Sequence, residues 1–135
     1  MAAELEEAHA ALERALAHDR SGREREAIPH YRSALAAGGL TVEEEQEALL
    51  GLGSSLRVLG EYEPACEVLV AAHERFPEYR AFEPFLAMTL LNLGRHDEAT
   101  ELLLRCLAET SADPSVSRYR RALLAYAPRL DETWG

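Results

Sequence analysis

Apolar residues recur along this chain at the three- and four-residue spacing of an amphipathic α-helix. The first stripe predicts a helix over residues 2–19 and consists of Leu5, Ala8, Leu12, Ala15 and Leu16. Similar stripes predict six more helices, over residues 24–37, 42–58, 62–75, 80–93, 96–109 and 115–127. The pattern therefore predicts an all-α protein.

Residues at the predicted helix ends support these boundaries. Gly60 falls at a helix C-terminus, where a positive φ is easy only for glycine. Thr41 and Glu44 have the spacing of a capping box, and Pro84 fits the first turn of a helix. Pro29 lies beyond the first turn of the second helix, so we expect a kink there.

Much of the sequence repeats with a period of 34 residues. Gly60 and Gly94 are 34 residues apart, and their neighbours repeat with them: Leu52-Gly53 returns as Leu86-Ala87, Leu56 as Leu90, Ala65 as Ala99, and Leu69 as Leu103. A fainter copy precedes the second by 38 residues and contains Gly22, Ala27, Tyr31 and Ala34. The four extra residues fit at Gly38-Gly39, and the small residues provide room where helices cross closely.

The second repeat resembles the tetratricopeptide pattern W-x2-L-G-x2-Y, A-x3-F, P. Its residues are Leu49-x2-Leu52-Gly53-x2-Leu56, then Ala65-x3-Leu69, Ala72 and Pro77. Leucines stand at the aromatic positions, but the spacing and the small residues agree. The chain is therefore similar to the tetratricopeptide repeat superfamily, and in particular to its small bacterial single-domain members.

This resemblance implies a right-handed α-solenoid. Three helix pairs, over about residues 5–38, 42–77 and 79–112, would form one domain spanning residues 1–135. A helix over about residues 115–127 would cap the open end of the array.

Composition excludes several classes of function. The net charge is −10 with a pI of about 4.9, and the chain contains no lysine, so nucleic acid is not an expected partner. No apolar run approaches the roughly 20 residues that span a bilayer, and the acidic start lacks an apolar leader. We therefore expect no membrane partner and a cytoplasmic location.

The candidate chemistry is sparse. The histidines form no H-x3-H or H-E-x-x-H pair, and Cys66 with His73 supplies only two ligands. No nucleophile motif or phosphate-binding glycine loop occurs. The sequence therefore predicts no enzyme activity, no metal and no cofactor.

The resemblance implies a concave groove lined by the first helix of each pair. Removing the core positions of the helix over 42–58 leaves a stripe that contains Leu50, Ser54 and Arg57, and the repeat shifts extend it to both neighbours. The predicted groove residues are Leu12, Leu16, Leu50, Ser54, Arg57, Phe85, Met88, Leu91 and Asn92. Leu12 and Leu16 fit the core equally well, and the C-terminal helix could instead cover Phe85, Met88 and Leu91.

The function implied by the resemblance is a non-enzymatic scaffold that binds an apolar or amphipathic segment of a protein or peptide. One alternative is a homodimer in which a second copy closes the groove. Another is a small acidic secretion-type chaperone, which would need a longer apolar N-terminal helix.

Overall fold

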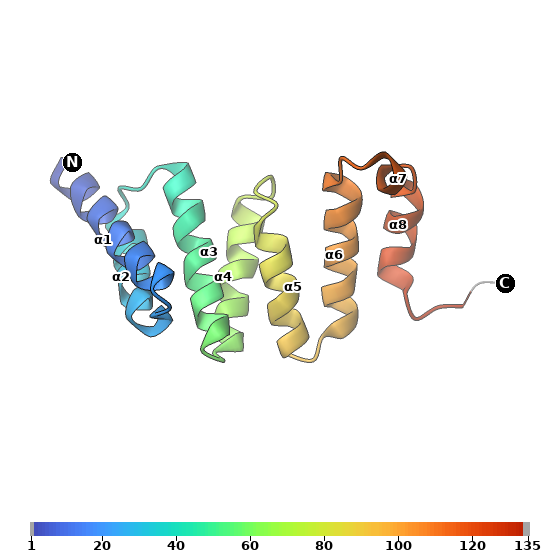
Figure 1. Cartoon of the computed structure of the whole chain (residues 1–135), viewed down its shortest axis with the longest axis horizontal. Coiled ribbons are helices and arrows are strands. Elements are labelled where there is room, and N and C mark those ends of the chain that lie inside the picture. Colours follow the sequence, from blue (N-terminus) through green and yellow to red (C-terminus); the bar gives the residue numbers. More distant parts are fainter. Residues whose placement is uncertain (1, 134–135) are drawn as a thin grey trace.

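The computed structural model describes residues 2–133, which form a row of helices (Figure 1). Their bounds are α1 (Ala2–Arg20), α2 (Glu24–Ala37), α3 (Val42–Val58), α4 (Tyr62–Arg75), α5 (Phe82–Asn92), α6 (His96–Thr110), α7 (Pro114–Ser117) and α8 (Arg120–Tyr126), followed by the 3₁₀ turn η1 (Ala127–Arg129). Over these residues there is no strand, so the all-helical prediction is confirmed. The bounds of the first six helices agree with the prediction to within two residues.

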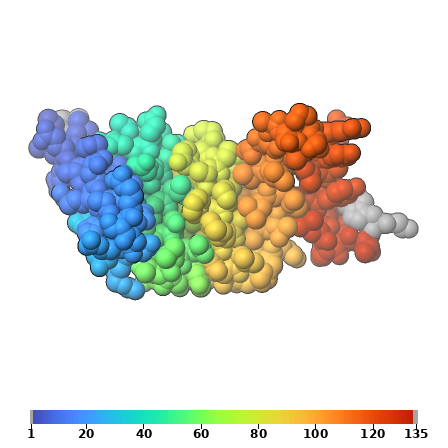
Figure 2. Space-filling model, in the orientation of Figure 1, coloured from blue at the N-terminus to red at the C-terminus, as the bar shows by residue number. Residues whose placement is uncertain are grey.

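The helices pack as successive pairs. α1 packs against α2, α3 against α4, and α5 against α6, while α2 meets α3 and α4 meets α5 in the next pair. Direct contacts of α3 with both α1 and α5 make the first helices one layer. Figures 1 and 2 show the resulting elongated body, with α1 at one end and α8 at the other. This arrangement is a helical solenoid.

Small residues in the core allow the paired helices to approach closely. Ala65 has no exposed surface and belongs to the cluster shared by the first two pairs. At Gly53, an added Cβ would lie only 2.6 Å from Leu69 Cγ. The positions that the repeat pattern predicts to be small are therefore sites where a larger side chain would overlap a neighbouring helix.

The turns inside the second and third pairs have the same geometry. Gly60 has a φ of 82°, and the Glu61 N–H donates to the Leu56 carbonyl over 2.9 Å. In the third pair, Gly94 has a φ of 79°, and the Arg95 N–H donates to the Leu90 carbonyl over 2.9 Å. The 34-residue period is therefore a repeat of backbone conformation, in which glycine ends each first helix.

The predicted helix start at Thr41 is confirmed, and no break occurs at Pro29. The capping box is present, because the Glu44 N–H donates to Thr41 Oγ1 and the Thr41 N–H donates to Glu44 Oε1. Pro29 lies inside α2, which continues through it as an unbroken helix. Pro29 is exposed, and the missing N–H leaves only one bond of the ladder unmade.

The single C-terminal helix predicted over residues 115–127 is wrong, because α7 and α8 are separate. The break lies at Tyr119, whose N–H donates to the Val116 carbonyl three residues back. A hydrogen bond to the third residue back, in place of the fourth, is the 3₁₀ pattern, which is wound more tightly than an α-helix. Asp113 is the N-cap of α7, and its side chain accepts a hydrogen bond from the Ser115 N–H. Neither short helix contains a buried residue, so packing does little to hold the two in line.

Candidate protein-binding surface

A hollow of about 230 Å³ opens on the layer formed by α1, α3 and α5. We call it the first-helix hollow, and its lining residues are Leu16, Asp19, Tyr31, Glu47, Leu50, Gly51, Ser54 and Phe85. Four of the predicted groove residues meet here, namely Leu16, Leu50, Ser54 and Phe85. All three helix pairs contribute to this one depression.

Tyr31 reaches the hollow from α2 through a gap left by Gly51. A Cβ at Gly51 would lie 2.4 Å from Tyr31 Cζ, so only glycine admits the ring. The buried phenol donates a hydrogen bond of 2.5 Å to Asp19 Oδ2. Burial raises the pKa of Tyr31, and the bond to the Asp19 carboxylate raises it further. The buried ring of Tyr31, hydrogen-bonded to Asp19, therefore forms the side of the hollow near α1.

Gly51 and Tyr31 are part of this surface, although neither was predicted to be. A glycine inside a helix costs about 1 kcal/mol relative to alanine and therefore indicates a packing requirement. Gly51 lies between the predicted groove residues Leu50 and Ser54, so this signal was present in the sequence.

The structure corrects the prediction for Leu12. Its side chain is only 1% exposed and belongs to the core shared by the first two pairs. Leu16, one turn later, packs against that core and also lines the hollow. The longer spacing between the first two repeats made it hard to predict which residues of α1 face the core. Because Leu12 is buried, a partner cannot contact it.

The predicted apolar stripe of α5 continues beyond the hollow. Phe85 lines the hollow, Met88 is half-buried, and Leu91 is 51% exposed. α8 packs against α6 and η1, at the end of the row. Leu91 therefore remains open to solvent.

Arg57 and Asn92 lie together at the ends of α3 and α5. Arg57 Nη1 donates to Asn92 Oδ1 over 3.0 Å. This bond links the first helices of the second and third pairs. Arg57 and Asn92, two of the predicted groove residues, are thus partners of one another, and neither lines the first-helix hollow.

A comparison with protein families decides the identity of this fold. The sequence model of the family described as tetratrico peptide repeat matches residues 8–130. The chain belongs to the tetratrico peptide repeat family. No curated protein matches it. Repeats of this family generally mediate protein–protein interactions and are non-catalytic scaffolds.

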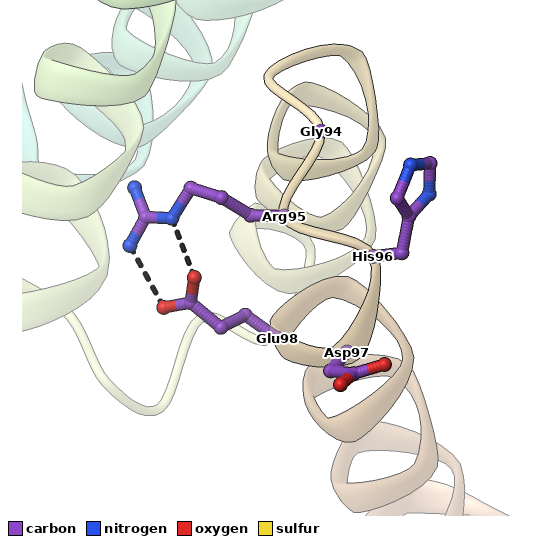
Figure 3. Close-up of a pocket in the computed structure, with 5 residues that line it drawn as sticks. All are labelled: Gly94, Arg95, His96, Asp97 and Glu98. Carbon is purple, nitrogen blue, oxygen red and sulfur yellow. Dashed lines mark hydrogen bonds and ion pairs between the residues drawn. The ribbon is translucent and has the colours of Figure 1, made fainter. Parts of the chain in front are cut away.

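A second depression of this repeat protein lies at the turn before α6 and has a volume of about 350 Å³ (Figure 3). Arg95 donates two hydrogen bonds to the Glu98 carboxylate, of 2.5 and 2.8 Å, and lowers the pKa of Glu98. The side chains of His96 and Asp97 point away from this pair. The depression is lined by an exposed ion pair and by residues at the start of a helix. None of the lining residues is a nucleophile oriented by a base.

Two further properties concern metals and membranes. Among residues 2–133, no three His, Cys, Asp or Glu side chains are grouped so that they could hold a metal ion. In the same range, no helix of the repeat protein has the length and apolar content needed to cross a membrane.

The N-terminal part of the repeat layer contains a titratable contact. His9 Nδ1 lies 2.7 Å from Glu44 Oε2 and joins α1 to the start of α3. The hydrogen bond to Glu44 raises the pKa of His9. Bonds from Thr41 and then His9 lower the pKa of Glu44.

Both shifts define the pH range in which this contact stabilises the fold. The raised pKa of His9 gives stability that is complete below its unfolded value, about 6.5, and is lost as pH rises through the folded value. The lowered pKa of Glu44 gives stability that is complete above its unfolded value, about 4.5, and is lost as pH falls through its folded value. The contact is therefore strongest between these two limits.

We expect Glu44→Gln to lower the pKa of His9, as measured by NMR titration. Glutamine retains the capping-box bond to Thr41 but removes the charge, so the helix start is preserved. Glu13→Gln is the control, because Glu13 lies 3.9 Å from His9 and is the smallest contributor to its shift. An equal decrease in both variants would show that Glu44 has no special role.

Proposed function

We propose that this repeat protein is a non-enzymatic scaffold that binds an amphipathic helical segment of a protein partner through the first-helix hollow. The observation that supports this most directly is the convergence of Leu16, Leu50 and Phe85, one from each helix pair, on one open apolar depression. An apolar depression that is shared by all three pairs suits a side chain from another polypeptide.

The size of the hollow favours an anchoring side chain over a small-molecule ligand. Its volume of about 230 Å³ is below the roughly 300–1,000 Å³ of most ligand pockets. A large apolar side chain of a partner helix would fill it, and neighbouring turns of that helix would lie along α3 and α5. Leu91, which is exposed near the C-terminal end of α5, would then contact a second apolar residue.

Charge supports a partner with basic residues beside the apolar anchor. The carboxylates of Asp19 and Glu47 line the hollow, and Glu47 is exposed. The chain has a net charge of −10, so its field attracts cationic segments and repels anionic ones. The expected partner segment is therefore amphipathic and carries Lys or Arg next to its apolar stripe.

We expect Ser54→Glu to weaken the binding of such segments about tenfold or more, because a carboxylate in the hollow loses hydration when the anchor enters. Ser54 is half-buried at the hollow and belongs to neither core cluster, so the fold should be unaffected. The measurement is the Kd of helical peptides selected from a display library against the unmodified protein.

The matched control is Ser33→Glu, which makes the same charge change at an exposed position of α2. Equal Kd values for the two variants would mean that the peptides bind another face. Failure of the library to yield any binder would contradict the proposal. Light scattering that shows a dimer dissociated by Ser54→Glu would instead identify a second copy as the occupant.

A further inference from the structure

The last α-helix, α8, aligns with α5, the first helix of the third pair, when the numbering is shifted by the 34-residue repeat. A shift of 34 residues carries Leu86, Ala87 and Leu90 of α5 onto Arg120, Arg121 and Leu124 of α8. In α5 these three positions are 6%, 1% and 6% exposed, in the pair that α5 forms with α6. In α8, Arg120 and Arg121 are exposed and Leu124 is half-buried.

The difference arises because α8 has no second helix of its own in the part of the chain that the structure describes. After η1, residues 130–133 form no further helix. Figure 2 shows the C-terminal helices, in dark orange and red, at the end of the elongated body. Because α8 packs on α6 as α5 packs on α4, it corresponds to the first helix of a further pair, whose second helix is not among the described residues.

A hollow of about 540 Å³ lies on α7 and α8, and we call it the α8 hollow. It is lined by Ser117, Arg118, Arg120, Arg121 and Leu124. Four of these, all but Arg118, correspond by the 34-residue shift to the α5 positions Glu83, Leu86, Ala87 and Leu90, all of which are buried. The surface that α5 buries in its own pair is thus open on α8.

The charge of the α8 hollow is opposite to that of the protein as a whole. Among the described residues, the guanidinium groups of Arg118, Arg120 and Arg121 make no ion pair or hydrogen bond, and that of Arg118 lies over the ring of Tyr119. By contrast, Arg80, Arg95 and Arg105 each contact at least one carboxylate. Three guanidinium groups within four residues, without carboxylate partners, form a site for anionic groups in a protein of net charge −10.

From these observations we infer that the α8 hollow docks an acidic amphipathic helix of a partner protein, in the place of the second helix of a fourth pair. The repeat geometry determines the helical shape of the occupant. Arg120 and Arg121 require carboxylates where a second helix of this family presents apolar residues. Leu124 would contact the apolar side of the docked helix.

This docking site is independent of the proposed function. It lies on α7 and α8 at the end of the solenoid, and it shares no lining residue with the first-helix hollow. The two sites also select opposite charges, because carboxylates line one and guanidinium groups line the other. Failure of either proposal therefore leaves the other intact.

The probe for this site is based on α4, the helix that occupies the equivalent place on α3. It is a synthetic peptide of residues 62–75, constrained as a helix by a lactam on its outer face, with Cys66→Ala and Leu69→Glu. Leu69 is the residue that packs on Gly53, which corresponds to Arg121 after two repeat shifts. The neutral control peptide carries Leu69→Gln in place of Leu69→Glu.

We expect the whole protein to bind the glutamate peptide about tenfold more tightly than the glutamine peptide at low salt, as measured by fluorescence anisotropy. The variant Arg120→Glu/Arg121→Glu should lose this preference. The matched control Arg25→Glu/Arg32→Glu should keep it, because it makes the same charge change at exposed positions of α2. Circular dichroism checks that each variant is folded.

Several outcomes would overturn the inference. These are equal affinity for the two peptides, absence of binding by either, and loss of the preference in both double variants. A concentration-dependent increase in mass that the Arg120→Glu/Arg121→Glu variant abolishes would overturn it as well. That result would identify the occupant as a second copy, whose exposed Glu4, Glu6 and Glu7 are also acidic.

Discussion

Replacing Tyr31 by alanine is expected to lower the free energy of unfolding by about 3–5 kcal/mol. Tyr31 is among the largest side chains without exposed surface, and it lies in the core shared by the first two helix pairs. The truncation leaves a cavity between α2 and α3 that the tightly packed neighbours can close only in part. A loss of this size is a large share of the roughly 5–15 kcal/mol that holds a typical domain folded. Urea denaturation followed by circular dichroism measures it.

Two control variants separate the causes of this loss. Tyr31→Phe removes only the hydroxyl that donates to Asp19, and should cost about 1 kcal/mol. Tyr119→Ala removes the same ring from a position that is 57% exposed, and should change stability by less than about 0.5 kcal/mol. Equal losses for Tyr31→Ala and Tyr119→Ala would contradict the packing observed around Tyr31.

The helices and turns of this protein could be predicted because local residues determine them. The apolar stripes give the helical period, and Gly60 ends α3 with a conformation that few other residues adopt. Thr41 and Glu44 satisfy the first N–H groups of α3 within four residues of sequence. Each of these features depends on neighbours in the chain, so the sequence alone is sufficient.

The candidate surface could be predicted only in part, because it depends on contacts between repeats. Leu16 and Leu50 line the hollow, but Leu12 is buried, since the register of α1 relative to α3 is set by packing. The approach of Tyr31 to Gly51 joins residues 20 positions apart, on different helices. The glycine inside α3 signals a packing requirement, but the residue that packs on it is evident only once the helices are placed in space.

The break before α8 has a different cause. The apolar pattern from Ser115 to Tyr126 suits one continuous helix, and the backbone at Tyr119 departs from it. A helix inside the array packs against helices before and after it, whereas, among the described residues, α7 packs on α6 and α8 packs on α6 and η1. The same open side leaves Arg120 and Arg121 exposed at positions that are buried in α5. The end of the solenoid is thus where the repeat pattern predicts the structure least well.

Replacing Ala65 by leucine is the second change for which we expect a large effect, a loss of about 1–3 kcal/mol. Ala65 has no exposed surface at the crossing of α3 and α4, where it belongs to one cluster with Leu52 and Leu56. A leucine there must displace one of these helices or adopt an unfavourable rotamer, because the crossing leaves no room for three more carbon atoms. The measurement is again urea denaturation.

Ala71→Leu is the matched control, since Ala71 is an exposed residue of the same helix. Leucine and alanine have similar helix propensities, so this variant should remain within about 0.5 kcal/mol of the parent protein. If Ala71→Leu and Ala65→Leu lower stability equally, the close crossing cannot be the cause of the loss at Ala65. If only Ala65→Leu does so, the requirement for a small residue lies at the position that recurs as Ala99 one repeat later.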